Sequence, residues 1–214
     1  MQIKLTLPPI SKERNILGIS REELLSFMQE FENQPKRASM RVSQLWSWIY
    51  CHGITSFEKM TNIDKDLRAK LTKAFVVSRP NIEKKEMSND GTIKYLFCLD
   101  DNSKIETVFI PEETRSTLCI SSQVGCTLSC SFCHTGTQKL VRNLSSQEII
   151  GQVIAVYDDL DLWKKMKKDR GISSYFEVIT NIVFMGMGEP LLNIDDLLLS
   201  IRSINEDFQI SQRK

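Results

Sequence analysis

One stretch decides the fold of this 214-residue chain: Thr117-Leu-Cys-Ile-Ser-Ser-Gln-Val-Gly-Cys126-Thr-Leu-Ser-Cys130-Ser-Phe-Cys133. Its first part has the apolar and β-branched residues of a short strand. Its second part places three thiols within eight residues. A single loop that directly follows a strand can therefore wrap one metal centre with all three thiols.

The residues after this loop predict a strand and helix pattern. Ser145 and Glu148 form a capping box that opens a helix. Residues 181–185 predict a buried strand, and the turn Gly186-Met-Gly-Glu-Pro190 leads into a second helix with Asn193 as its cap. The order strand, loop, helix, strand, loop, helix is typical of a parallel α/β fold, in which chemistry lies at the carboxyl ends of the strands.

Two regions precede this pattern. Residues 92–100 and 104–110 are β-rich runs separated by a polar turn, and they predict a hairpin. Apolar residues at helical spacing predict a small helical module over roughly residues 16–78. We therefore divide the chain into a helical accessory domain over residues 1–90 and a region over residues 91–214 that contains the hairpin and two β/α units.

The overall composition is that of a soluble globular protein. The chain has 28 Lys and Arg against 27 Asp and Glu, and 41% of its residues are apolar, which excludes a disordered tail and a bulk polycation. Residues 36–79 are nevertheless locally basic, which favours binding of a phosphate backbone, although a solvated helical surface explains the same pattern. The basic residues of this window are Lys36, Arg37, Arg41, Lys59, Lys65, Arg68, Lys70, Lys73 and Arg79, against Glu58, Asp64 and Asp66.

The sequence predicts a cytoplasmic protein. It has no apolar run long enough to span a bilayer, and residues 1–14 carry charges and prolines where a signal peptide needs an apolar stretch. The reducing cytosol disfavours structural disulfides. The six cysteines are therefore candidates for metal binding or chemistry rather than for stapling the fold.

The spacing of the three loop cysteines favours an iron–sulfur cluster over zinc. Structural zinc takes four protein ligands, and His134 directly follows Cys133, so it would have to fold back onto the same ion. We interpret His134 as loop structure or as a weak partner of the ligands rather than as a ligand itself. A four-iron cluster held by Cys126, Cys130 and Cys133 alone keeps one iron open, as a reactive centre requires.

The same spacing, with an aromatic residue before the last cysteine, resembles the radical S-adenosylmethionine superfamily. Four further segments occur in the order found in its adenine carbon-2 RNA methyltransferases, the RlmN/Cfr family. The helical module also resembles the RNA-binding domain of that family, so the resemblance covers nearly the whole chain. The segments are Glu106-Thr-Val, Thr117 to Cys126, Arg142-Asn-Leu and Gly186 to Pro190.

The resemblance implies a fold, two cofactors and a set of roles. The fold would be α/β, the N-terminal part of a radical S-adenosylmethionine partial (β/α) barrel preceded by the helical domain and the hairpin extension. The cofactors would be a 4Fe-4S cluster and S-adenosylmethionine. The roles would be cluster ligation by Cys126, Cys130 and Cys133, contact with S-adenosylmethionine by Gly188 and Glu189, proton acceptance by Glu106, and resolution of a crosslink through a transient disulfide by Cys119. Cys51 and Cys98 match no functional position and are expected to pack.

The activity implied by the resemblance is methylation of carbon 2 of adenine in 23S ribosomal RNA through a methylated cysteine and a radical. Transfer RNA is a further candidate substrate, and specificity for carbon 8 is an open alternative. The partners would be the RNA and a reductase that donates electrons. We expect a monomer that does not bind a membrane.

A second hypothesis is that the chain is a catalytically incomplete fragment. Members of the family continue beyond the point that corresponds to Lys214, and the methyl-carrying cysteine lies in that continuation. No cysteine follows Cys133 in this sequence. On this hypothesis the chain alone binds a cluster or RNA without methylating it.

Overall fold

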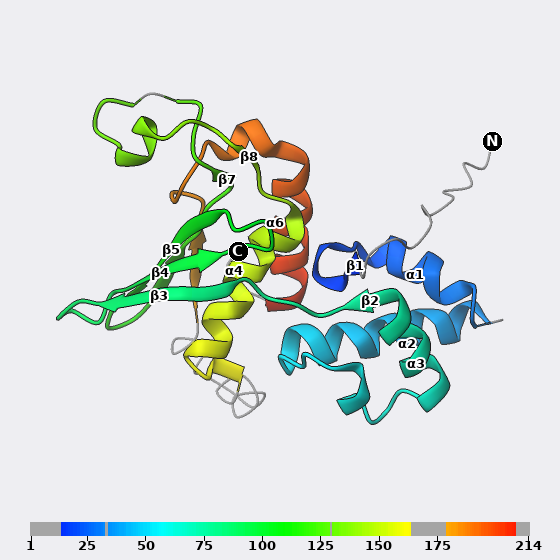
Figure 1. The fold of residues 1–214 in the computed structure, drawn as a ribbon. Coiled ribbons are helices and arrows are strands. Elements are labelled where there is room, and N and C mark those ends of the chain that lie inside the picture. The colour runs from blue at the N-terminus through cyan, green and yellow to red at the C-terminus, as the bar shows by residue number, and fades with distance from the viewer. Residues whose placement is uncertain (1–13, 33, 129, 164–178, 209–214) are drawn as a thin grey trace.

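The computed structural model describes residues 14–32, 34–128, 130–163 and 179–208. A helical module lies beside a mixed β-sheet that has helices packed on one face (Figure 1). Within these ranges, no helix is both long enough and apolar enough to cross a membrane.

The helical module has the helices that the apolar spacing predicts. Ser20 accepts a hydrogen bond from the Glu23 amide at 3.2 Å and Asp64 accepts one from the Leu67 amide at 2.9 Å, so each side chain caps the start of a helix. A two-stranded parallel pair, β1 with β2, joins the module's ends. The elements are β1 (Arg14–Asn15), a 3-10 turn (Ile16–Gly18), α1 (Arg21–Gln29), α2 (Pro35–Trp46), a π-helical turn (Ser47–Cys51), a 3-10 turn (Phe57–Lys59), α3 (Lys65–Ala74) and β2 (Phe75–Val76).

The main sheet has five strands in the order β3-β4-β5-β6-β9. The first four are antiparallel neighbours, whereas β6 and β9 are parallel. Strand β3 was not expected from the sequence, because it is charged, shows no apolar alternation and is exposed at every residue. It lies before the domain boundary placed at residue 90. The strands are β3 (Asn81–Met87), β4 (Ile93–Cys98), β5 (Lys104–Pro111), β6 (Ser116–Cys119) and β9 (Asn181–Val183).

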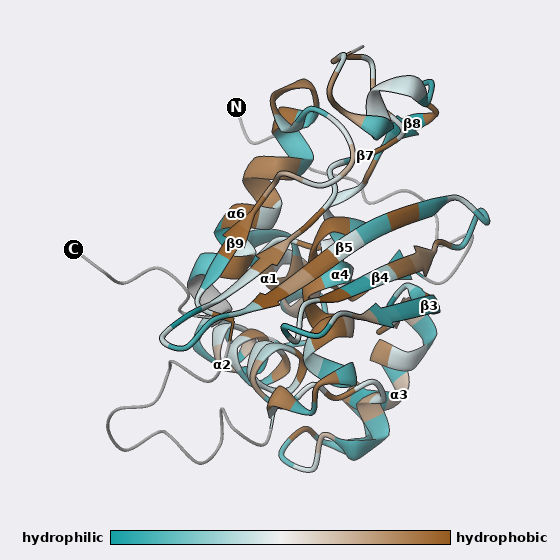
Figure 2. Cartoon of the chain, turned by 90° about the vertical axis from the view of Figure 1, so that its left-hand side faces the viewer, coloured by the Kyte–Doolittle hydropathy of each residue, from teal (hydrophilic) through white to brown (hydrophobic). Residues whose placement is uncertain are grey.

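The two faces of this sheet differ. Tyr95, Ile105 and Leu118 are fully buried on the face that packs against the helices. The opposite face carries residues that the pleat places alternately with them, including Glu106 and Cys119, and these are partly exposed. Strand β3 is largely hydrophilic in Figure 2.

A β/α unit connects the two parallel strands. After β6 come β7 (Gln123–Val124), a 3-10 turn (His134–Thr137) and β8 (Arg142–Asn143), then α4 (Ser146–Asp159) and β9, followed by a 3-10 turn (Pro190–Asn193) and α6 (Ile194–Phe208). The predicted capping box of Ser145 and Glu148 is present at the start of α4. Asn193 directly precedes α6, but its amide donates to the carbonyls of Ser122 at 3.0 Å and Leu144 at 2.7 Å.

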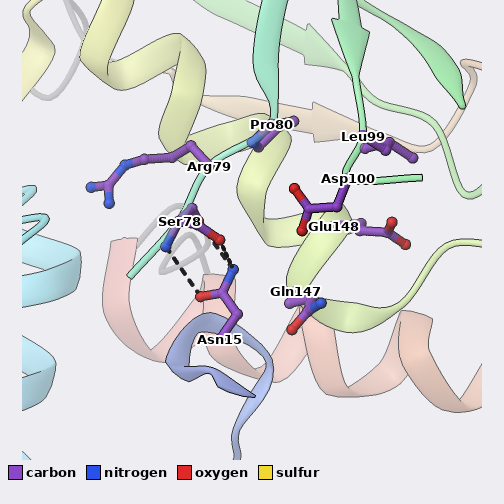
Figure 3. A pocket seen from close by; sticks show the side chains of 8 residues that line it. All are labelled: Asn15, Ser78, Arg79, Pro80, Leu99, Asp100, Gln147 and Glu148. Atoms are coloured by element: carbon purple, nitrogen blue, oxygen red, sulfur yellow. Dashed lines mark hydrogen bonds between the residues drawn. The ribbon is translucent and has the colours of Figure 1, made fainter. Parts of the chain in front are cut away.

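Polar side chains fix the junction between the module and the sheet. The Asn15 amide donates to the Ser78 hydroxyl at 2.8 Å, beside a cavity also lined by Asp100 and Glu148 (Figure 3). Arg79 donates to Asp158 of α4 at 2.6 Å and to the Gly53 carbonyl at 3.1 Å. The module is thereby tied to the helix that follows the thiol-rich loop.

Candidate functional site

The loop that carries the three clustered thiols is closed at its base. We call residues 125–141 the thiol loop. Gly125 has φ +75°, and a Cβ added there would lie 2.1 Å from the Lys139 carbonyl oxygen. Only glycine allows this approach without a backbone shift. The Cys126 amide donates to the Gln138 carbonyl at 3.4 Å, and β7 pairs with β8 beyond it.

The three thiols are close in the sequence, but they do not converge on one point in the structure. Cys126, Cys130 and Cys133 are free and partly exposed. Among the residues that the structure describes, no three His, Cys, Asp or Glu side chains are close enough to hold a metal ion. The Leu128 amide donates to the Cys126 sulfur at 3.3 Å. Three soft donors on one loop fit a cluster with an open iron, provided that the loop closes around it.

The glycine turn, which we define as Gly186–Pro190, has a fixed position at the end of β9. The Gly186 amide donates to the Ile120 carbonyl at 3.1 Å, and the Ser122 amide donates to the Met187 carbonyl at 2.9 Å. Gly188 has φ +95°, and a Cβ there would lie 2.4 Å from the Gln123 Cβ. The turn is thus held by backbone contacts with the segment that leads into the thiol loop.

Gln123 connects the glycine turn to the far end of the thiol loop. Its Oε1 accepts from the Glu189 amide at 2.9 Å, while its Nε2 donates to the Asn143 Oδ1 at 2.8 Å. The Glu189 carboxylate accepts from the Leu191 amide at 3.1 Å, so it also caps the short turn that follows. The structure therefore brings the predicted residues Gly188 and Glu189 to the same edge of the sheet as the thiol loop.

Glu106 and Cys119 lie on the open face of neighbouring strands. Cys119 is opposite Val108 on β5, so Glu106 is its diagonal neighbour on the same face. Lys94 of β4 forms an ion pair with Glu106, with 2.6 Å between Nζ and Oε1, and both side chains are substantially exposed. Burial raises the pKa of the Cys119 thiol, and a contact with the Met185 backbone opposes this effect.

Sequence analysis missed the polar residues that organise this edge. Ser121 and Gln152 are fully buried and hydrogen bonded to each other, and Gln123 and Asn143 form the second link. A lone buried glutamine in an apolar helix was the only signal available for Gln152. Its partner lies 31 residues away, so no local pattern could identify it.

The basic window of the helical module divides into two groups. Arg41 is 8% exposed and binds Asp64 at 2.9 Å and the Asn62 carbonyl at 3.1 Å, and Arg79 is held at the junction with α4. These two arginines are structural, so including them in a field available to phosphates was wrong. The other cations of the window remain at the surface: Lys36, Arg37, Lys59, Lys65, Arg68, Lys70 and Lys73.

Comparisons with known proteins agree with this geometry. Residues 14–77 match the family model described as "Ribosomal RNA large subunit methyltransferase N-terminal domain". A protein from Paracoccus denitrificans (strain Pd 1222), named "Dual-specificity RNA methyltransferase RlmN", is 46% identical over 98% of this chain and 54% of its own length. A protein of the same name from Phenylobacterium zucineum (strain HLK1) is 46% identical over 96% of this chain and 53% of its own length.

A solved structure has a similar fold. It is a radical SAM methyltransferase from Sphaerobacter thermophilus, with a TM-score of 0.73 and 32% identity, covering 91% of this chain and 52% of that one. The chain spans about half the length of the curated relatives it matches. Over nearly its whole length the chain is therefore similar in sequence to proteins named RlmN, and its mixed α/β fold is similar to that of a radical SAM methyltransferase.

Proposed function

We propose that this chain acts in methylating carbon 2 of adenine in 23S ribosomal RNA and in transfer RNA, by radical chemistry that uses S-adenosylmethionine. One observation carries the proposal: the thiol loop and the glycine turn lie at the carboxyl ends of the adjacent parallel strands β6 and β9, tied through Gln123. The name of the relatives, "Dual-specificity RNA methyltransferase", supports two RNA substrates. The β6-α4-β9 unit supports the start of a partial (β/α) barrel.

The thiol loop would hold the iron–sulfur cluster through Cys126, Cys130 and Cys133. A 4Fe-4S cluster bound there supplies the electron that cleaves S-adenosylmethionine. Gly188 and Glu189 would contact the methionine part of S-adenosylmethionine, because a glycine backbone permits close approach and a carboxylate accepts hydrogen bonds from an ammonium group. The fixed position of the glycine turn supports this role.

Glu106 and Cys119 would act on the open face of the sheet. The Glu106 carboxylate would accept the proton from carbon 2 of adenine. Glu106 lies on an exposed strand face, which leaves room for the adenine ring to approach it. The Cys119 sulfur would form a transient disulfide with the methyl-carrying cysteine and so release the RNA. Its half-buried position beside Val108 and Val183 supports this role, because such a thiol would be reached by its partner cysteine only within the enzyme–RNA complex.

The helical module within the domain placed over residues 1–90 would hold the RNA, and residues 91–214, with β3 paired to their sheet, would carry the chemistry. The six exposed lysine and arginine residues of the basic window, together with the partly exposed Arg68, support RNA contact, since phosphate backbones bind clustered Lys and Arg. We further propose a cytoplasmic monomer that receives electrons from a reductase.

Anaerobic reconstitution tests the cluster. The chain is incubated with iron and sulfide, and bound iron and visible absorbance are measured; about four irons per chain are expected. Cys126→Ser, Cys130→Ser and Cys133→Ser should each lose the cluster. The control is Cys98→Ser, which alters a cysteine on β4 outside the loop and should load normally. A stable zinc complex without iron would contradict the proposal.

Charge reversal tests the RNA surface. Arg68→Glu with Lys70→Glu should weaken binding to an RNA oligonucleotide by about tenfold and lower the salt dependence by roughly one unit per lost phosphate contact. Lys84→Glu with Lys85→Glu, on exposed strand β3, is the matched control. If both pairs of substitutions weakened RNA binding equally, the effect would be a non-specific one of charge, and the module would have no special role in RNA binding.

A further inference from the structure

A buried polar network connects the strand of Glu106 to the glycine turn. Its centre is Ser121, two residues beyond Cys119 and fully buried. The Ser121 hydroxyl donates to the Glu106 carbonyl at 2.6 Å and accepts from the Met187 amide at 2.9 Å. One hydroxyl thus joins β5 directly to the turn that contains Gly188.

Gln152 of α4 fixes Ser121 from the other side. Its Oε1 accepts from the Ser121 amide at 2.8 Å, and its Nε2 donates to the Ser121 carbonyl at 3.0 Å. The Gln152 carboxamide therefore forms the two backbone hydrogen bonds that a neighbouring β-strand would form with Ser121. Its Oε1 also accepts from the Thr107 hydroxyl at 2.8 Å, and Thr107 is the residue after Glu106.

The network uses the hydrogen-bonding capacity of Gln152 fully. Oε1 has two donors, and Nε2 has the Ser121 carbonyl and, at 3.4 Å, the Glu148 carbonyl as acceptors. A carboxamide offers two lone pairs and two N–H groups, so its orientation is fixed by the backbone groups of Ser121. Fully satisfied buried networks of this kind make a local arrangement rigid and unique.

We propose that Ser121 and Gln152 are positioning residues, which set the distance between the base Glu106 and the S-adenosylmethionine contacts Gly188 and Glu189. This inference rests on the proposed function. The two groups come from segments more than 80 residues apart in the sequence, yet a single serine oxygen bridges their backbones. Because Glu106 would act on the adenine while Gly188 and Glu189 hold the S-adenosylmethionine that reacts beside it, a small displacement of either group lowers the fraction of molecules with productive geometry.

Binding of S-adenosylmethionine to the reconstituted chain tests the proposal. Ser121→Ala removes the acceptor of the Met187 amide, and Gln152→Leu removes the clamp on Ser121. Each should weaken binding of S-adenosylmethionine on the order of tenfold while the iron content stays normal. Thr107→Val removes only the outer link and should have a smaller effect, which keeps the test valid if Gln152→Leu fails to fold.

Ser200→Ala is the matched control. Its buried hydroxyl donates to the Asp196 carbonyl at 2.7 Å within α6 and does not contact the glycine turn. RNA binding by the same preparations separates positioning from general destabilisation, because unfolding lowers both affinities, whereas displacement of the turn lowers only that for S-adenosylmethionine.

The possible failures are distinguishable. If the wild-type chain binds iron but no S-adenosylmethionine, the proposed function fails and this inference fails with it. If the wild-type chain and Ser121→Ala bind S-adenosylmethionine equally well, only the positioning role is overturned. If Ser121→Ala loses RNA binding in proportion, its role is structural and the proposal is also overturned.

Discussion

The thiol loop and the glycine turn lie at the same edge of the sheet, but they are organised differently. The glycine turn is held by backbone bonds to Ile120 and Ser122 and by the side chains of Ser121 and Gln123. The thiol loop is closed at its base, while its outer part leaves Phe132 92% exposed and its thiols apart. The glycine turn is thus already ordered without a ligand, whereas the thiol loop would take its final arrangement only when a ligand binds.

Hydrogen exchange gives the largest expected contrast. Amides of the thiol loop should exchange rapidly in the iron-free chain and slow by on the order of a hundredfold after cluster reconstitution, because the ligand restricts a locally open segment. The Met187 amide should be protected in both states, since it donates to Ser121. Mass spectrometry of deuterated peptides measures both regions in one experiment.

Cys130→Ser provides the control for this contrast, because it should abolish the slowing in the thiol loop without altering the glycine turn. Strong protection of the loop in the iron-free chain would show that the loop is already organised, and the distinction between the two regions would then be lost.

Gly188→Ala tests the rigidity of the glycine turn. The substitution introduces strain at φ +95° and a contact of 2.4 Å with Gln123. We expect it to lower the free energy of unfolding by about 3 kcal/mol, measured by urea denaturation. Gly91→Ala is the matched control: φ is +83° there, but the new Cβ would be 3.2 Å from a proline side chain, so strain without severe overlap should cost about 1 kcal/mol.

Gly125→Ala makes the corresponding change at the base of the thiol loop. The overlap is more severe, since the new Cβ would lie 2.1 Å from the Lys139 carbonyl oxygen at φ +75°. We nevertheless expect a smaller loss of stability, about 1–2 kcal/mol, because the loop can move away from the sheet. Iron loading should fall. A loss larger than that of Gly188→Ala would mean that the loop is the more rigid region.

Alkylation of Cys119 gives the smallest expected effect. Burial raises the pKa of its thiol, so less thiolate is present near pH 8 than in the unfolded chain. Peptide mass spectrometry should show it reacting with iodoacetamide at least about fivefold more slowly in the folded chain than in urea. A thiol with a raised pKa stabilises the fold below its ordinary pKa, and this contribution is lost as pH rises through the folded value. Equal rates in both states would contradict the burial argument.

Local patterns predicted the parts of the fold that depend on neighbouring residues. The capping box of Ser145 and Glu148, the hairpin of β4 and β5 and the parallel pair around α4 follow from short-range chemistry, and the structure confirms them. Strand β3 has no such pattern, because it is an exposed edge strand that gains its structure from pairing with β4.

The candidate site was predictable only in its chemistry-bearing residues. Thiols and glycines at fixed spacing are visible in sequence, and the structure brings Gly188, Glu189 and the thiol loop to one edge. The roles of Glu106, Cys119 and the cluster cysteines remain proposals. Arg41 and Arg79 were misread because a count of charges does not show that each arginine is held by one carboxylate, Asp64 for Arg41 and Asp158 for Arg79. The same limit concealed the Ser121 and Gln152 network.

The two edge strands of the five-stranded sheet, β3 and β9, differ, and this difference determines where a further strand can pair. Edge strand β3 carries Glu83, Lys84, Lys85 and Glu86 in succession, and an incoming strand would have to desolvate these charges. At the other edge, β9 pairs with β6 alone among the described strands, and its residues Asn181, Ile182 and Val183 are exposed or partly exposed. Additional strands, natural or engineered, are therefore directed to join at β9, which gives the sheet a single direction of extension.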